Sequence, residues 1–264
     1  MIPNILSIAG SDPSGGAGIQ ADLKAISANG GYGMAAITAL TAQNTRGVEA
    51  VSLVAEEVVA AQIAAVRADI RVDAVKIGML GTAGIAAAVA GALAGLSAPV
   101  VVDPVMVAKG GDRLLAAEAV AALRDRLLPL AAVVTPNLPE AADLLEEAEA
   151  QDLAGMERQA RALLALGPRA VLLKGGHLAG DDSPDLLVTA DGVLRLDGPR
   201  HATRNTHGTG CTLSAALACC LGRGLPLAEA ARAAKAYTAA AIAAADRLQV
   251  GHGHGPTHHF HAFY

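Results

Sequence analysis

Tryptophan is absent from the 264-residue sequence and aromatic side chains make up only 2% of it, so a core must come from Ala, Val, Leu and Ile. Clusters of lysine and arginine are missing as well, and the net charge of -5 argues against a nucleic-acid partner. No apolar run reaches the ~18 uncharged residues that a membrane-spanning helix needs. We therefore expect a protein that acts on small molecules and binds neither nucleic acid nor membrane.

Cysteine is also scarce. The chain has three cysteines, and two of them, Cys219 and Cys220, are adjacent, which does not suit the disulfide framework of a secreted domain. We expect both to be buried small apolar residues. Residues 1–12 lack a basic segment followed by a long apolar stretch, so no signal peptide is expected. Together these features predict a cytoplasmic, reduced protein.

Short apolar runs alternate with helical stretches along the chain. Strands are predicted at residues 4–10, 33–43, 73–80, 99–104, 131–137 and 170–176. Helices are predicted at residues 19–31, 56–70, 82–96, 116–128, 139–148 and 156–167. Repeated strand–helix–strand units predict a mostly parallel α/β sheet with helices on both faces.

The last third of the chain has a different pattern. Residues 185–196 alternate on both sides of Ala190-Asp191-Gly192, which predicts an antiparallel hairpin. Two helices follow, around Gly222-Arg223-Gly224. No linker rich in Pro, Ser or charge divides the sequence, so we expect a single domain over residues 1–264.

In such sheets a ligand binds beyond the carboxyl ends of the strands, so the binding residues are expected directly after each strand. After the first strand, the glycine-rich stretch from Gly10 to Asp22 does not meet the G-x-G-x-x-G spacing of a dinucleotide site. It suits either a backbone-lined pocket for a small substrate or a flexible turn before a helix. Gln43 follows the second strand, where a carboxamide can pair with a ring nitrogen and an adjacent amine, or can simply be solvated.

Charged and polar residues follow three further strands. Asp103, Asn137 and Glu140 offer oxygen ligands of the kind that Mg²⁺ takes, but Asn137 and Glu140 are also spaced as a helix-capping pair. Lys174 either approaches a phosphate or is a surface charge. Both interpretations stay open at this point.

The turn before the penultimate helix has the clearest chemistry. In "NTHGTGC", Gly208, Thr209, Gly210 and Cys211 lead into an apolar helix, so backbone N–H groups and the helix N-terminus can form an anion hole. The P-loop pattern G-x-x-x-x-G-K-[ST] is absent, as are the H-R-D and D-F-G motifs of protein kinases.

Seven blocks in order resemble the hydroxymethylpyrimidine/phosphomethylpyrimidine kinases of thiamin biosynthesis, in the ribokinase-like superfamily. They are "SIAGSDPSGGAGIQADLK", "TALTAQNTRGV", "VKIGML", "DPVMVAKGGDRLL", "TPNLPEA", "LLKGGH" and "NTHGTGCTLSAALA". The one departure is Gly110-Gly111, where a serine is expected before the second glycine.

The resemblance implies ATP-dependent phosphorylation of 4-amino-5-hydroxymethyl-2-methylpyrimidine to its monophosphate and then to its diphosphate. It also implies a ribokinase-like three-layer sandwich, a homodimer and Mg²⁺. The residues that it assigns are Gln43, Gly10, Asp22, Met79 and Val107 for the pyrimidine, Lys174, Asn137, Thr206 and His207 for ATP, Glu140 and Asp103 for the metal, and Gly208, Thr209, Gly210 and Cys211 for catalysis.

Cys211 stands where many relatives in the superfamily carry an aspartate as general base. A thiolate can take that role, and a helix N-terminus is expected to lower the pKa of the thiol below its usual ~8.5. The monophosphate is already ionised at neutral pH, so only the alcohol needs a base.

Two other functions stay open from the sequence. A pyridoxal or pyridoxine kinase shares the G-T-G-C turn, and a non-catalytic pyrimidine sensor would share the pocket. A cysteine hydrolase lacks an obvious partner for Cys211, because a glycine-rich turn need not aim His207 inward. The His-rich tail at residues 251–264 either binds a metal or packs on the surface or near a dimer contact.

Overall fold

The computed structural model describes residues 1–106 and 117–264, and all nine strands found there form one sheet in the order β3-β2-β1-β4-β5-β6-β7-β8-β9. Val107 and Gly110-Gly111 lie outside the described residues. The strands are β1 (Asn4–Ser11), β2 (Tyr32–Asn44), β3 (Gly47–Leu53), β4 (Ala74–Ile77), β5 (Val100–Val102), β6 (Val133–Val134), β7 (Ala170–Lys174), β8 (Asp185–Thr189) and β9 (Gly192–Leu196).

The centre of the sheet is parallel and both edges are antiparallel. Strands β2, β1, β4, β5, β6 and β7 run parallel, whereas β3 pairs antiparallel with β2, and β8 and β9 continue antiparallel from β7. The predicted hairpin is therefore confirmed, with Thr189 opposite Gly192.

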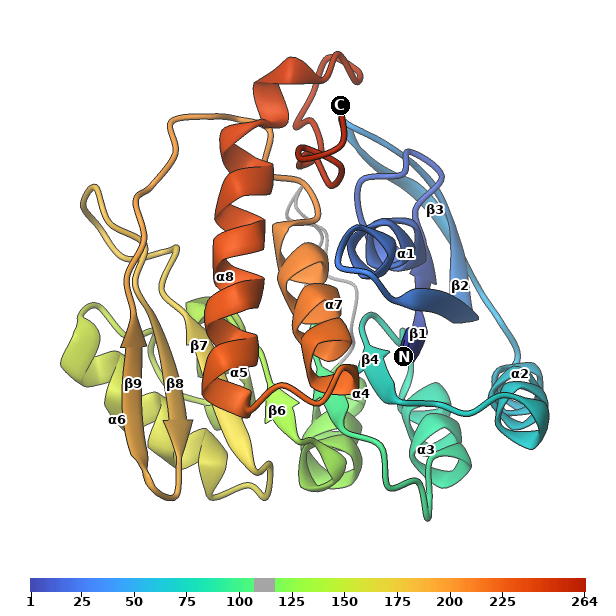
Figure 1. Cartoon of the computed structure of the whole chain (residues 1–264). Coiled ribbons are helices and arrows are strands. Elements are labelled where there is room, and N and C mark those ends of the chain that lie inside the picture. The colour runs from blue at the N-terminus through green and yellow to red at the C-terminus, as the bar shows by residue number, and fades with distance from the viewer. Residues whose placement is uncertain (107–116) are drawn as a thin grey trace.

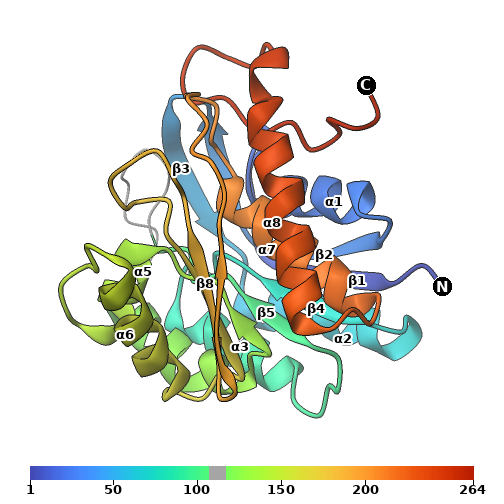
Figure 2. The ribbon, with the colours of Figure 1, turned by 60° about the vertical axis from the view of Figure 1, so that its left-hand side comes forward.

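Helices cover both faces of the sheet (Figure 1). One face carries α2 (Glu56–Asp69), α3 (Ala83–Ala92), α4 (Ala117–Ala122), α5 (Leu138–Leu145) and α6 (Leu153–Leu164). The other carries α1 (Gly18–Ala28), α7 (Thr209–Gly222) and α8 (Leu227–Ala243). Figure 2 shows β8 between α5 and α6 on one side and α7 and α8 on the other. The three-layer α/β sandwich predicted from the sequence is confirmed.

Helix α7 is the most enclosed helix of the second face. Its residues from Thr212 to Cys220 are all buried, as an apolar helix between a sheet and other helices requires. Small alanines let α7 lie close to β4 and β5, and Cys219 and Cys220 are buried there as predicted. This packing fixes the N-terminus of α7 above the carboxyl ends of the central strands.

Two parts of the fold were not anticipated. Strand β3 was missed because five of its seven residues are exposed, so it carries no burial pattern. The tail was expected to pack on the surface or near a dimer contact, and in the structure Thr257, His258 and His259 are buried within the chain. His207 donates its backbone N–H to the carbonyl of Gly255, so the tail lies against the turn that opens α7.

None of the helices in residues 1–106 and 117–264 has both the length and the hydrophobicity needed to cross a membrane.

Candidate active site

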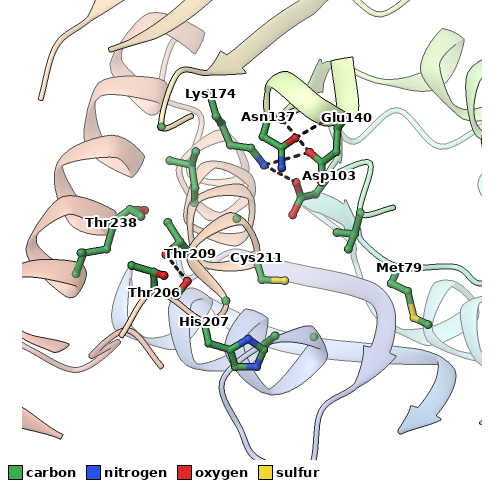
Figure 3. A pocket seen from close by; sticks show the side chains of 18 of the residues that line it. Met79, Asp103, Asn137, Glu140, Lys174, Thr206, His207, Thr209, Cys211 and Thr238 are labelled. Atoms are coloured by element: carbon green, nitrogen blue, oxygen red, sulfur yellow. Dashed lines mark hydrogen bonds and ion pairs between the residues drawn. The ribbon is translucent and has the colours of Figure 1, made fainter. Parts of the chain in front are cut away.

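A cavity of about 870 Å³ opens at the carboxyl ends of the parallel strands, where the sequence placed the ligand site (Figure 3). Its walls come from the ends of β1, β2 and β7, from the segments that follow β4, β5 and β6, and from the start of α7. The predicted site residues that line it are Gly10, Gln43, Met79, Asp103, Asn137, Glu140, Lys174, Thr206, His207, Gly208, Thr209, Gly210 and Cys211. The structure thus brings residues from across the chain to one cavity.

The turn that opens α7 leaves little room for side chains at its two glycines. Gly208 has φ 77°, and a Cβ there would lie 1.8 Å from the carbonyl oxygen of Gly16. A Cβ on Gly210 would lie 3.3 Å from Lys174 Nζ and 3.5 Å from Asp103 Oδ2. The two glycines therefore bring the positive end of α7 next to an ammonium group, which suits a bound anion.

Lys174 lies between two buried carboxylates. Its Nζ donates to Asp103 Oδ1 at 3.0 Å and lies 3.7 Å from Glu140 Oε2. Burial opposes the charge on Lys174, but Asp103 and Glu140 outweigh it and raise the pKa of the ammonium. Burial opposes the ionisation of Asp103 too, but Lys174 and Lys76 lower its pKa. Lys174 and Asp103 are thus a charged pair on the cavity wall.

Asn137 and Glu140 cap the start of α5. Asn137 Oδ1 accepts the Glu140 N–H at 2.8 Å, and Glu140 Oε2 accepts the Asn137 N–H at 2.8 Å. This is a complete capping box, yet both side chains also line the cavity. Burial raises the pKa of Glu140 to about 7, with Lys174 opposing and Asp103 adding to the rise. Capping explains the position of this pair, and both side chains remain on the cavity wall.

A second buried ion pair was missed from the sequence. Lys76 Nζ lies 2.9 Å from both oxygens of Asp22, and Ser7 Oγ donates to Asp22 Oδ2 at 2.6 Å. Lys76 lines the cavity, whereas Asp22 is fully buried behind it and does not line the cavity. A lysine inside the apolar strand "AVKI" was the available signal.

Cys211 is half-buried at the start of α7, and its thiol does not behave as the sequence suggested. Burial raises the pKa of Cys211 to about 11, Asp22 and Asp103 add to the rise, and Lys76 opposes it. The expected fall in the pKa is therefore wrong, because desolvation of the thiolate outweighs the Lys76 ammonium and the backbone hydrogen bond from Gly18.

The glycine-rich turn after β1 is organised by Asp12, which the sequence analysis also missed. Its carboxylate accepts the backbone N–H groups of Ser14 and Ala17, each at 2.8 Å. His207 Nε2 lies 2.8 Å from Asp12 Oδ2 and 3.4 Å from Gln43 Nε2. The signal in the sequence was an aspartate followed by Pro, Ser and glycines, a turn pattern. The His207 ring, expected near ATP, lies against the residue expected to bind the pyrimidine.

The sequence is similar to those of known proteins over nearly its whole length. A family model described as Phosphomethylpyrimidine kinase matches residues 12–258. The chain belongs to the phosphomethylpyrimidine kinase family. The hydroxymethylpyrimidine/phosphomethylpyrimidine kinase of Rhizobium meliloti (strain 1021) is 58% identical over 259 residues, which cover 98% of this chain and 97% of that protein. The protein of that name from Escherichia coli (strain K12) is 55% identical over 262 residues, 99% and 98% of the two chains.

Solved structures agree with this family membership. A Bacillus subtilis pyridoxal kinase in an ADP complex matches with a TM-score of 0.91 and 38% identity over 98% of each chain. A phosphomethylpyrimidine kinase from Clostridium difficile 630 matches with a TM-score of 0.79 and 43% identity over 89% of this chain and 97% of that one. This member of the phosphomethylpyrimidine kinase family is therefore a phosphotransferase with a ribokinase-like fold.

Proposed function

We propose that this chain uses ATP to phosphorylate 4-amino-5-hydroxymethyl-2-methylpyrimidine and then its monophosphate, giving the diphosphate needed for thiamin. The observation that carries the proposal is one cavity that joins the Gln43 carboxamide to the anion hole at the start of α7. Its support is the 58% and 55% identity to kinases named for both steps. ATP as co-substrate is supported by neighbours of 34% identity in complex with ADP and AMP-PCP.

We propose a role in phosphoryl transfer for each group that lines the cavity. The backbone amides of residues 208–211 receive the charge that develops on the equatorial oxygens of the γ-phosphoryl group. Lys174, held by Asp103 at 3.0 Å, offsets phosphate charge. The transition state is loose, so positioning contributes more than bond-making by the protein.

We also propose that the site binds Mg²⁺, because the side chains on one cavity wall are of the kind that this ion takes as ligands. Asp103 and Glu140 place carboxylates on the cavity wall beside the Asn137 carboxamide, and Mg²⁺ uses few protein ligands while keeping several waters. Asp103 and Glu140 would hold the ion, which supplies charge neutralisation for the phosphates when it is bound. The homodimer and the cytoplasmic location stay predictions.

Replacement of Cys211 by alanine is expected to affect the two phosphorylations differently. With the pKa of Cys211 at about 11, the thiolate is scarce at neutral pH but is the group that can accept the alcohol proton. We expect Cys211→Ala to slow phosphorylation of the alcohol by about 100-fold. The monophosphate, already ionised above its second pKa of about 6, should be affected by no more than about threefold.

The pH dependence checks the same role. The alcohol rate of the unaltered enzyme should rise with pH towards 11, because the base is the deprotonated form of Cys211, whereas the monophosphate rate should be flat above neutral pH. Cys211→Ala should remove that rise. Equal losses for the two substrates in single-turnover measurements would refute the base role.

Pyridoxal is the second candidate substrate. The pyridoxal kinases of Bacillus subtilis and Staphylococcus aureus match this fold with TM-scores of 0.91. Their identities of 38% and 34% are lower than the 58% to the Rhizobium kinase, which favours the aminopyrimidine.

A coupled ADP-release assay across the aminopyrimidine, its monophosphate and pyridoxal tests the proposal. We expect kcat/KM for both aminopyrimidines to exceed that for pyridoxal by at least about 100-fold, because unpaired polar groups in a fitted site are costly. A preference for pyridoxal would contradict it.

A further inference from the structure

The Gln43 carboxamide has a polar side chain on each flank. Thr41 Oγ1 lies 3.2 Å from Gln43 Oε1, and His207 Nε2 lies 3.4 Å from Gln43 Nε2. Each neighbour also has a second partner, since Thr41 Oγ1 lies 2.9 Å from the carbonyl of Ser11 and His207 Nε2 lies 2.8 Å from Asp12 Oδ2. The hydrogens of these groups can therefore be counted.

His207 Nε2 carries a hydrogen. Asp12 is buried and accepts hydrogen bonds from the backbone of Ser14 and Ala17, so its carboxylate is the acceptor in every contact. Burial opposes its ionisation, but the hydrogen bonds from His207 and Ser14 outweigh burial and lower the pKa of Asp12. Facing a carboxylate at 2.8 Å, His207 Nε2 is the donor.

That hydrogen decides which way the carboxamide faces. With the Gln43 nitrogen towards His207, two donors meet, and Ser11 and Gln43 compete for the single hydroxyl hydrogen of Thr41. Half a turn of the carboxamide replaces the contact between two donors with one between a donor and an acceptor. Oε1 then shares the Nε2–H of His207 with Asp12 Oδ2, and Nε2 donates to Thr41 Oγ1, whose own hydrogen goes to the Ser11 carbonyl.

We propose that Asp12 and His207 are positioning residues that hold the Gln43 carboxamide with its oxygen on the His207 side and its nitrogen on the Thr41 side. The inference rests on the proposed function. The oxygen keeps one lone pair and the nitrogen one hydrogen for a ligand. A 4-aminopyrimidine can then pair at both points only with its amino group towards His207 and its ring nitrogen towards Thr41.

This orientation determines where the reacting oxygen lies. On the substrate ring the hydroxymethyl group is next to the amino group, and the methyl group is next to the paired ring nitrogen. The amino group towards His207 therefore places the hydroxymethyl group on the side where the chain continues into Gly208. Figure 3 shows the His207 ring below Cys211 at this side of the cavity. A reversed carboxamide would bring the methyl group there instead.

Binding of a matched pair of ligands tests the inference. The 4-oxo analogue of the substrate carries an acceptor at position 4 and an N–H at the ring nitrogen, so it requires the reversed carboxamide. We expect the unaltered chain to bind the amino compound at least about 100-fold more tightly. His207→Asn removes the donor at the ε position and should narrow the ratio of dissociation constants to less than about tenfold. His207→Gln places a donor at that position again and should keep the ratio within about threefold of the original.

The ratio separates positioning from general damage, since a disturbed cavity would weaken both ligands by similar factors. Thr41→Val removes the hydrogen-bond partner on the other side of the carboxamide, so it should also narrow the ratio of dissociation constants. If His207→Asn does not fold, Thr41→Val is the variant that tests the inference. An unchanged ratio in His207→Asn would overturn the inference but not the proposed function. If His207→Asn does not fold, an unchanged ratio in Thr41→Val has the same meaning. No binding of the aminopyrimidine by the unaltered chain would overturn the proposed function and the inference with it.

Discussion

Gly208→Ala is expected to lower turnover of both substrates by at least about 100-fold, the loss typical when one element of a charge-stabilising site is displaced. Gly208 has φ 77°, and an added Cβ would lie 1.8 Å from the carbonyl oxygen of Gly16 and 2.8 Å from its carbonyl carbon. Both contacts are backbone, so no side chain can move aside. The turn itself must shift, and with it the first amides of α7.

Gly224→Ala is the matched control for this variant. Gly224 has φ 84°, so alanine meets the same unfavourable backbone region there, but nothing lies within 4 Å of the added Cβ. We expect a loss of about 1 kcal/mol in the free energy of unfolding with turnover unchanged. Steady-state kinetics and thermal unfolding of both variants give the comparison. Equal turnover in the two variants would mean that the turn is not part of the phosphoryl-transfer site.

Lys174→Met is expected to lower kcat by about 100- to 1,000-fold with a much smaller change in KM for the pyrimidine. The reason is that Lys174 lies beside the anion hole and is the ammonium that pairs with Asp103 at 3.0 Å. The variant also leaves two carboxylates, those of Asp103 and Glu140, facing one another without that cation. We therefore expect a loss of about 3 kcal/mol in the free energy of unfolding.

Arg161→Met is the control for loss of a cation. Arg161 pairs with Glu157 at 2.7 Å on the exposed face of α6. Its removal should lower the free energy of unfolding by about 0.5 kcal/mol at most and leave kcat unchanged. Kinetics on folded protein, with the melting temperature recorded for each variant, separates chemistry from stability. A Lys174→Met enzyme that keeps more than a third of the original kcat would contradict the assigned role.

The sequence predicted the parts of the site that lie where strands end. Gln43, Asp103, Asn137 and Lys174 follow apolar runs, and in a parallel sheet such positions meet at one edge. This is why the cavity wall could be anticipated before any contact was known. The glycine spacing at residues 208–210 similarly indicated a backbone site at a helix start.

Contacts between distant segments could not be predicted in the same way. The pair of Lys76 on β4 and Asp22 on α1 joins residues that are 54 positions apart. It depends on the pairing of β1 with β4 and on the packing of α1 against β1. The link between Asp12 and His207 spans 195 positions. For Cys211 the sequence showed the helix start but not the burial, and burial dominates its pKa.

We propose that one cavity performs both phosphoryl transfers, at the turn from Gly208 to Cys211. A ³¹P NMR time course with ATP and the aminopyrimidine alcohol, run on the unaltered chain and on Gly208→Ala, tests it most directly. The unaltered chain should form the monophosphate first and then the diphosphate, and Gly208→Ala should slow the two steps by the same factor. A Gly208→Ala enzyme that loses one step and keeps the other at full rate would contradict a single site.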